Sequence, residues 1–297
     1  MLTAVMNMLL RRTVRSWFDT EPDPKTVRRK LDALIGRTDP LSSRYACTPA
    51  GMAGGATLHL IAPKRPSPPG APLTLYFHGG GYIVGSLASH GAFCGRLANR
   101  IGGAVLFADY RLAPEHRFPA AFEDGVAAYH AALAQSTGKL FVAGDSAGGG
   151  LAITVAQAAR AQGLREPDGL ILFSPWADLT LSAPSMVSNA ATDVMLSTKI
   201  LIRMRSAYLN MHDPADRHAS PLFDPNARLP RVLLIYSLAE VLRDDSTRLA
   251  AQLRAAGTEV VEAAYRGMPH VFPLFRILPA ARRALREVEA FTGSGAK

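Results

Sequence analysis

Two glycine-rich motifs contain the residues best suited to chemistry. One reads H-G-G-G at residues 78–81, and the other reads G-D-S-A-G at residues 144–148, between an apolar run and a helical pattern. A serine in a sharp turn between a strand and a helix exposes its hydroxyl, and flanking glycines let neighbouring chain approach it. Backbone N–H groups of the first motif can bind the oxyanion formed when this serine attacks a carbonyl. The two motifs therefore predict an acyl-transfer site with Ser146 as the nucleophile.

A serine hydroxyl needs a base, and His270 is the histidine best placed to supply it. It follows the last predicted strand and precedes the last predicted helix, so it falls at the same edge of the sheet as Ser146. Imidazole titrates near neutral pH and can both accept and return a proton. His90 could also approach this edge, from the chain that follows the first motif.

An acid must orient the imidazole, and three carboxylates follow the strand predicted at residues 232–236. Glu240 comes first, in the loop. Asp244 and Asp245 precede a predicted helix, where carboxylates commonly cap the N-terminus. We therefore predict Glu240 as the triad acid, with Asp244 as the alternative.

The oxyanion is expected to be held by main-chain donors from both motifs. These are the N–H groups of Gly80, Gly81 and Ala147. Three residues are expected to support them: His78, Gly79 and Asp145. His78 is better suited to brace its own loop than to catalyse, and its spacing from His90 is not that of a metal site. We expect no metal and no organic cofactor, because acyl transfer through a serine needs neither.

The elements that position these residues alternate along the chain. Apolar strands are predicted at residues 73–77, 104–108, 140–143, 170–173, 232–236 and 259–264, and helices at residues 91–101, 120–135, 149–162, 245–256 and 280–291. Strands that are apolar at consecutive positions are buried on both faces. We predict an α/β fold with a mostly parallel central sheet and helices on both faces. A strand at residues 56–61 is expected to belong to an antiparallel hairpin that leads into this sheet.

Two regions fall outside the alternation, at residues 1–40 and 176–217. The second contains a helical pattern at residues 197–211 and follows the carboxyl end of a strand, where insertions lie over the ligand crevice of an α/β sheet. We predict that the two regions form a helical cap, with peripheral packing as the alternative. Residues 41–175 and 218–297 would form the core.

Composition limits the other functions to consider. The 297 residues are 48% hydrophobic and carry a net charge of +9, yet no aromatic interleaving or nucleic-acid motif accompanies the basic residues. We therefore expect no nucleic-acid binding. Residues 1–10 are apolar but precede the arginines, which is the wrong order for a secretory signal, and no run is long enough to span a membrane. Cys47 and Cys94 are too few for a disulfide framework. We expect a cytoplasmic protein without a stable membrane anchor.

Three longer motifs resemble those of the hormone-sensitive lipase family, the bacterial family IV carboxylesterases. They are H-G-G-G-Y at residues 78–82, D-Y-R-L-A-P-E at residues 109–115 and G-D-S-A-G-G at residues 144–149. The resemblance implies an α/β-hydrolase fold with a cap, in which Arg111 and Glu115 hold the loop beside the site. Many members read D-P-L-x-D near the acid, whereas this chain reads E-V-L-R-D at residues 240–244. Aligning the leucines puts Glu240 at the acid position.

The triad and the resemblance together predict a serine carboxylesterase. It would hydrolyse short- to medium-chain acyl esters through an acyl-enzyme intermediate. An amidase or lactonase would use the same residues, and a binding protein without activity could use the same fold, although the presence of Ser146, Glu240 and His270 argues against it. Similar enzymes often pair through the last strand, so a homodimer through residues 258–265 is also expected.

Overall fold

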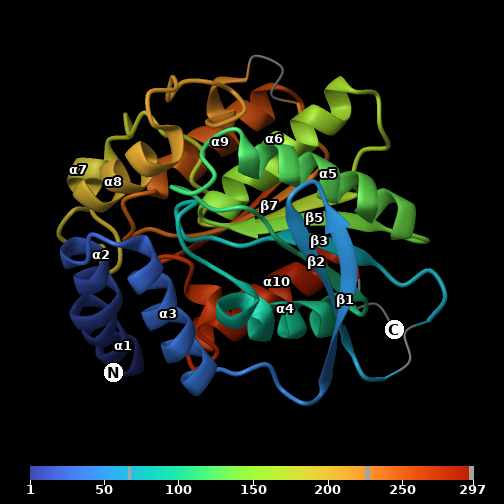
Figure 1. Cartoon of the computed structure of the whole chain (residues 1–297), viewed down its shortest axis with the longest axis horizontal. Coiled ribbons are helices and arrows are strands. Elements are labelled where there is room, and N and C mark those ends of the chain that lie inside the picture. The colour runs from blue at the N-terminus through green and yellow to red at the C-terminus, as the bar shows by residue number, and fades with distance from the viewer. Residues whose placement is uncertain (66–67, 225–227, 294–297) are drawn as a thin grey trace.

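A twisted sheet runs through the computed structural model, which describes residues 1–65, 68–224 and 228–293 (Figure 1). In this part of the chain the sheet has eight strands in the order β1-β2-β4-β3-β5-β6-β7-β8. Their bounds are β1 (Tyr45–Ala53), β2 (Ala56–Pro63), β3 (Leu73–Phe77), β4 (Ala104–Asp109), β5 (Leu140–Asp145), β6 (Gly169–Phe173), β7 (Val232–Ser237) and β8 (Val260–Tyr265). β2 pairs antiparallel with β1 and β4, and the pairs from β4 through β8 are parallel. The predicted mostly parallel sheet and the antiparallel hairpin are confirmed.

The apolar character of the central strands follows from helices on both faces of the sheet. Every residue of β3, β5, β6 and β7 is buried. Leu75 and Val142 pack into one cluster, while their neighbours Tyr76 and Ala143 pack into another on the opposite face. β8 departs from the prediction of full burial, because it is the last strand and its residues are only partly covered.

Figure 1 shows the helices of each face. On one side lie α5 (Ala120–Gln135), α6 (Ala147–Ala161) and α9 (Arg243–Ala255), and on the other lie α4 (Leu87–Ile101) and α10 (Pro279–Thr292). α4 begins four residues earlier than predicted, because the Ser86 side chain accepts the N–H groups of Ala88 and Ser89 and forms a capping box. Short 3₁₀ turns cover Pro221–Phe223 and Phe272–Leu274.

The two regions outside the alternation lie side by side at one end of the molecule (Figure 1). The first contains α1 (Leu2–Leu10), a π-helical turn (Arg11–Arg15), α2 (Ser16–Thr20) and α3 (Pro24–Thr38), and the second contains α7 (Ser185–Ser188) and α8 (Thr198–Leu209). The regions are joined by Arg203 of α8, whose guanidinium donates to the carbonyls of Phe18 at 2.5 Å and Glu21 at 2.8 Å.

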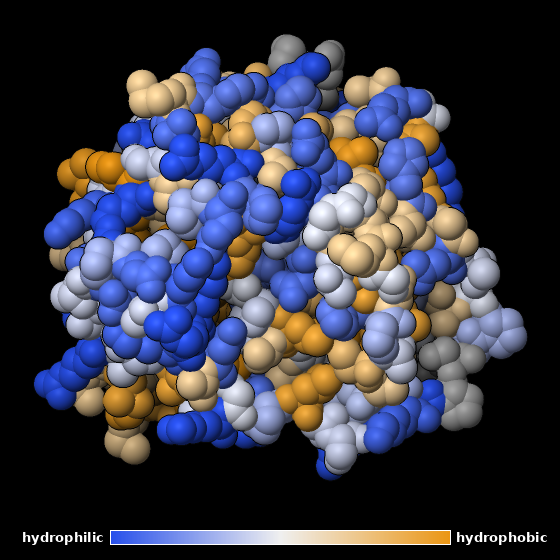
Figure 2. Space-filling model, viewed as in Figure 1, coloured by the Kyte–Doolittle hydropathy of each residue, from blue (hydrophilic) through white to orange (hydrophobic). Residues whose placement is uncertain are grey.

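The N-terminal helix is apolar on both its packed and its exposed sides. Figure 2 shows hydrophobic side chains at the lower left, where the chain begins, and Leu2, Val5, Met8 and Leu9 are exposed. On the inner side Leu10 is buried, as is Val14 of the π-helical turn that follows. No helix of the described residues is long and apolar enough to cross a bilayer.

Candidate active site

The nucleophile candidate lies in a sharp turn between β5 and α6. Ser146 has φ 52° and ψ −122°, a conformation that side-chain-bearing residues rarely adopt. The glycines beside it are required by space, since a Cβ on Gly148 would lie 2.1 Å from the Phe77 carbonyl oxygen and one on Gly144 would lie 2.2 Å from that of Gly148. Strand, strained turn and helix therefore form the predicted nucleophile elbow.

The three residues predicted as a triad meet at the carboxyl edge of the sheet. His270 Nε2 lies 2.9 Å from Ser146 Oγ, and His270 Nδ1 lies 2.5 Å from Glu240 Oε2. The other oxygen of Glu240 accepts the N–H of Ser237 at 2.9 Å, which fixes the carboxylate. Val271 follows the histidine with φ 48°, so strained backbone is found beside the candidate base as well as at the candidate nucleophile.

Burial and charge act in opposite directions on His270. Removal from water lowers the pKa of the imidazole, but the carboxylate of Glu240 raises it, and Asp193 and Asp145 add to this effect. The net result is a pKa above the ordinary value of 6.5. The ring is thus a stronger base than free imidazole, which favours removal of a proton from Ser146.

Two of the predicted oxyanion donors, Gly80 and Gly81, lie in a turn that only glycine fits. Gly80 has φ +115°, and a Cβ there would lie 2.3 Å from the Val84 carbonyl oxygen. Gly81 has φ +62°, and its Cβ would lie 2.3 Å from the Met204 sulfur. Within the described residues, the N–H groups of Gly80, Gly81 and Ala147 donate to no acceptor. Three free donors beside a nucleophile can stabilise an oxyanion.

Comparison with known proteins places the chain in a family. A family model for the alpha/beta hydrolase fold matches residues 74–274. An acetyl-hydrolase of Streptomyces hygroscopicus is 40% identical over 240 residues, covering 78% of this chain and 80% of that protein. An esterase of Acinetobacter venetianus is 33% identical over 290 residues, covering 96% and 94%. The crystal structure of an esterase from the bacterial hormone-sensitive lipase family matches with a TM-score of 0.88 and 31% identity, covering 96% of each chain. The chain belongs to the hormone-sensitive lipase family of α/β-hydrolases.

Membership of the hormone-sensitive lipase family defines the reaction class. The relatives are esterases, acetyl-hydrolases and carboxylic ester hydrolases, and this family member is a carboxylic ester hydrolase. Within residues 1–65, 68–224 and 228–293, no group of three or more His, Cys, Asp or Glu side chains could hold a metal ion.

Asp145 joins the two glycine motifs of this hydrolase. Its Oδ1 accepts the Tyr76 hydroxyl at 2.6 Å and the Gly79 N–H at 2.9 Å, and its Oδ2 lies 3.5 Å from His90 Nε2. Burial raises the pKa of this carboxyl, but the attraction of His90 and the hydrogen bonds leave it below its usual value. His90 therefore lies against Asp145, and the imidazole that contacts the Ser146 hydroxyl is that of His270.

His78 has the position of a brace. Its ring stacks on Tyr110 with centroids 4.3 Å apart, and its Nδ1 lies 2.8 Å from the Gly79 carbonyl oxygen. Burial lowers the pKa of His78 to about 3, so the ring is neutral at neutral pH. A neutral, stacked ring with a main-chain partner holds the glycine turn in place.

The D-Y-R-L-A-P-E segment of the family has structural partners. Arg111 contacts Asp124, with Nη2 to Oδ1 at 2.7 Å, and Glu115 contacts Arg28 at 2.9 Å. Arg28 belongs to α3 and also donates to the Ala113 carbonyl oxygen at 2.7 Å, so this segment is fastened to the N-terminal region.

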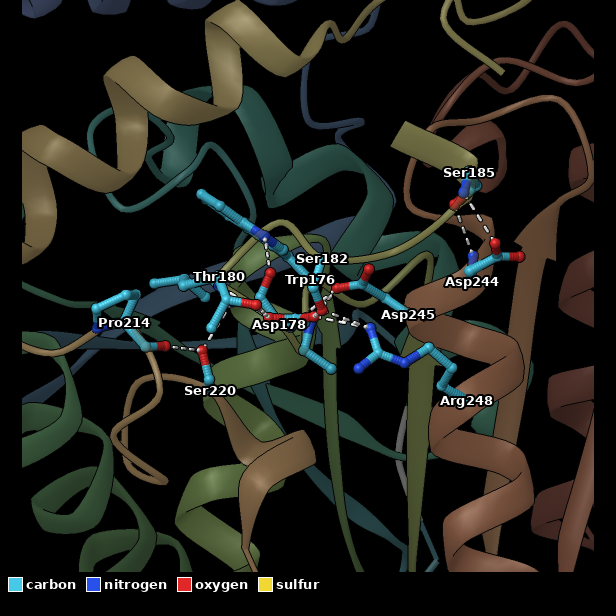
Figure 3. Close-up of polar contacts among 12 residues, drawn as sticks. Trp176, Asp178, Thr180, Ser182, Ser185, Pro214, Ser220, Asp244, Asp245 and Arg248 are labelled. Carbon is cyan, nitrogen blue, oxygen red and sulfur yellow. Dashed lines mark hydrogen bonds and ion pairs between the residues drawn. The ribbon is translucent and has the colours of Figure 1, made fainter. Parts of the chain in front are cut away.

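Asp244 and Asp245 do not cap α9, and that interpretation was wrong. The helix begins one residue before Asp244 and has no side-chain cap. Asp244 Oδ2 accepts the Ser185 N–H at 2.8 Å, and Asp245 Oδ2 accepts those of Ala177 and Asp178, both at 2.9 Å (Figure 3). Both carboxylates thus bind the 176–217 region, and neither contacts the imidazole of His270.

Sequence reasoning missed Asp193, a buried carboxylate beside residues 238–241. We call these residues the acid loop, because they carry the predicted acid Glu240. Asp193 Oδ2 accepts the N–H of Val241, the residue after Glu240, at 2.9 Å. The local signal was limited to a polar N-A-A-T-D segment at residues 189–193. The contact of Asp193 with Val241 joins residues 48 positions apart and cannot be derived from spacing.

Proposed function

We propose that this carboxylic ester hydrolase acts through a Ser146–His270–Glu240 triad. The supporting observation is the continuous chain of hydrogen bonds from the Ser146 hydroxyl through both ring nitrogens to the Glu240 carboxylate. His270 Nε2 takes the hydroxyl proton as Oγ attacks the ester carbonyl carbon. Glu240 holds the ring in the required tautomer and stabilises the imidazolium.

The developing negative charge falls on the former carbonyl oxygen. The N–H groups of Gly80, Gly81 and Ala147 bind it, a contribution of about 3 kcal/mol for a typical donor. His270 then returns its proton to the alcohol, which leaves, and the acyl group stays on Ser146. Water then loses a proton to His270 as it attacks the acyl carbonyl carbon. The bond to Ser146 Oγ breaks, His270 returns the proton to Oγ, and the carboxylic acid leaves the regenerated enzyme.

We propose short- to medium-chain acyl esters as substrates. Met204 of α8 contacts the Gly81 turn, so the 176–217 region lies directly beside the oxyanion site and limits the space there. We assign this region and residues 1–40 to a cap over the site, since they are joined through Arg203. The relative from Streptomyces is named an acetyl-hydrolase, which agrees with a small acyl group.

Steady-state kinetics on p-nitrophenyl acetate, butyrate, octanoate, laurate and palmitate test both proposals. We expect kcat/KM to be highest at butyrate or octanoate, and Ser146→Ala to abolish it along the whole series. A maximum at laurate or palmitate would overturn the chain-length proposal. Matching p-nitroanilides distinguish an amidase from an esterase. Full activity of Ser146→Ala would refute the assigned nucleophile.

We also propose that two copies pair through β8. This strand ends the sheet order within the described residues, and Val261 on it is 39% exposed. Open edges pair readily with other strands. Sedimentation velocity at several protein concentrations tests this. We expect a dimer for the parent and a shift toward the monomer for Val261→Pro, and a parent that stays monomeric at all concentrations would contradict the pairing.

A further inference from the structure

The loop that carries Glu240 is held by side chains from the 176–217 region. Asn189 Nδ2 donates to the carbonyl oxygens of Leu238 at 3.0 Å and Glu240 at 2.8 Å. Thr192 Oγ1 donates to the carbonyl oxygen between them, that of Ala239, at 2.8 Å. Three successive carbonyls of the acid loop are thus bound by one short segment of the chain.

Asp193 completes this arrangement from the acceptor side. Its Oδ2 takes the Val241 N–H at 2.9 Å, and its Oδ1 takes those of Met195 and Leu196, both at 2.8 Å. The side chain is buried and has no ion pair with Lys or Arg among the described residues. Burial raises the pKa of the Asp193 carboxyl above its usual value, while His270 and the three N–H donors act in the opposite direction and favour the charged form. We call Asn189, Thr192 and Asp193 the acid clamp.

The N-terminal region fastens the acid clamp from outside. Arg15 Nη1 donates to the backbone carbonyl of Asp193 at 2.5 Å, and Arg11 Nη2 donates to that of Ala191 at 2.9 Å. Both arginines belong to the π-helical turn between α1 and α2. Contacts therefore lead from the first helices, through residues 191–193, to the loop of Glu240.

Electrostatics link the acid clamp to the base as well as to the acid. The ionisable groups that act on His270 are Glu240 from the loop after β7, Asp193 from the 176–217 region and Asp145 from the end of β5. Asp193 is thus a second anion near the imidazolium that forms during turnover, beside the carboxylate that contacts it directly.

We propose that Asn189, Thr192 and Asp193 are positioning residues for Glu240, and that Arg15 holds them in place. Both regions of the cap are then required for the chemical step, in addition to any part in substrate selection. This inference rests on the proposed role of Glu240 as triad acid. Loss of the acid clamp misplaces Glu240, so the effect falls on kcat, while the ester still binds.

The test compares Asp193→Asn and Thr192→Val with the parent enzyme on one ester. In Asp193→Asn the amide cannot accept all three N–H groups and carries no charge. We expect kcat to fall about 10- to 100-fold, as for other displacements of a catalytic group by about 1 Å, with KM within about twofold. The acidic limb of the pH profile of kcat/KM is expected to move to lower pH, because one anion near His270 is removed. Thr192→Val, which loses the hydroxyl contacts to the carbonyl oxygens of Ala239 and Asn189 but keeps the charge of Asp193, should show a smaller fall in kcat.

Matched controls separate positioning from folding. Asp168→Asn alters a carboxylate that also accepts a backbone N–H, that of Leu140 at 2.9 Å, but at the opposite edge of the sheet. Arg12→Gln, an exposed neighbour, is compared with Arg15→Gln. Thermal unfolding shows that each variant is folded. We expect both controls to keep the parent kcat and pH limb, and Arg15→Gln to lower kcat.

A double-mutant cycle with Glu240→Gln decides whether Asp193 acts through Glu240. We expect Asp193→Asn to cost much less in the Glu240→Gln background than in the parent. An equal loss in both backgrounds would overturn the inference, as would a folded Asp193→Asn enzyme with parental kcat and an unmoved pH limb. Parental activity of Glu240→Gln alone would instead refute the triad proposed above, so the two failures are distinguishable.

Discussion

Asp145 and Gly79, 66 residues apart in the chain, are joined by a 2.9 Å hydrogen bond from the Gly79 N–H to the carboxylate. The residue before Ser146 therefore fixes the first glycine of the turn that carries the proposed oxyanion donors. A Cβ on Gly79 would lie 2.1 Å from Asp145 Oδ2, so only glycine permits this contact. The turn at Ser146 and the H-G-G-G turn are thus tied to each other, which would preorganise the proposed oxyanion donors.

Ser146→Ala is expected to remove turnover almost completely. Loss of the nucleophile in a well-studied serine protease costs about a million-fold in kcat. Labelling with a fluorophosphonate, followed by mass spectrometry of the modified peptide, measures the reactive group directly. We expect the parent to be labelled at Ser146 and the variant to be unlabelled, and a label at any other serine would contradict the assignment.

Glu240→Gln and Asp244→Asn should differ strongly. A neutral amide beside His270 Nδ1 cannot stabilise the imidazolium, and the equivalent change in a serine protease costs about 10⁴ in kcat. Asp244 lies against Ser185 and Arg243, so its substitution should leave kcat nearly unchanged. Stopped assays at high enzyme concentration measure both variants, and an inactive Asp244→Asn enzyme would disprove the assignment of the acid.

The pH dependence of kcat/KM follows from the state of His270. Its pKa lies above 6.5 because the attraction of Glu240 and its other neighbours outweighs the effect of burial, and only the neutral ring can accept a proton. Activity should therefore decline on acidification with a midpoint above pH 6.5. In Glu240→Gln the same limb should move to lower pH, since burial then dominates. A parent midpoint below that of free imidazole would contradict the proposed electrostatics.

Gly80→Ala tests the oxyanion turn. The new Cβ would overlap the Val84 carbonyl, and displacement of one donor is expected to lower kcat by roughly 100-fold or more. Gly163→Ala is the matched control, because Gly163 also has positive φ, at +66°, but has nothing within 4 Å of its Cβ position. The control should lose about 1 kcal/mol of stability and keep its kcat. Equal kcat values for the two variants would argue against the proposed turn.

Asp245 should make stability fall as pH rises. Burial raises the pKa of this carboxyl to about 8 in the folded protein, and the nearby Asp178 adds to the shift. Between about pH 4 and pH 8 the unfolded chain has released the proton that the folded chain keeps. The contribution of protonated Asp245 to the free energy of unfolding is therefore complete below about pH 4 and is lost as the pH rises to about 8.

Asp245→Asn resembles the protonated form and should show a smaller decline in Tm between about pH 5 and pH 8. Asp244→Asn is the contrasting control, because Arg243 holds the pKa of Asp244 below its usual value and this carboxylate stabilises the fold when ionised. Scanning fluorimetry across the pH range measures both. Parallel Tm curves for Asp245→Asn and the parent would rule out a buried acid with a raised pKa.

The sequence predicted the parts of the fold that depend on local pattern. β3 was predicted with its observed bounds, and β5 to β7 were predicted within two residues, because buried parallel strands are short, apolar and bounded by turns. The antiparallel partner of β2 in the predicted hairpin, β1, was not assigned to any residues. It contains Pro49 and a register shift before Met52, and most of its residues are exposed or only partly covered, so it has no apolar pattern.

The residues of the candidate site likewise fall into those that a local sequence pattern predicts and those that it does not. Ser146, His270 and Glu240 could be named because each follows a recognisable strand, and parallel strands bring their carboxyl ends to one edge. The acid clamp could not be named, since its partners are backbone groups of the loop that follows β7. The prediction that Asp244 and Asp245 cap a helix failed for the same reason. A carboxylate near the start of a helix commonly caps it, and only the folded chain shows that both side chains instead bind backbone N–H groups of a distant segment.

The hydrogen bonds from residues 189–192 to the Glu240 loop have a practical consequence for protein engineering. Exchange of lids between homologous enzymes is a natural way to alter selectivity. A chimera that replaces the whole of residues 176–217 would also replace the supports beneath the carboxylate. Grafts that retain 189–193, together with Arg11 and Arg15, would change the walls around the substrate and leave the proton-transfer machinery intact.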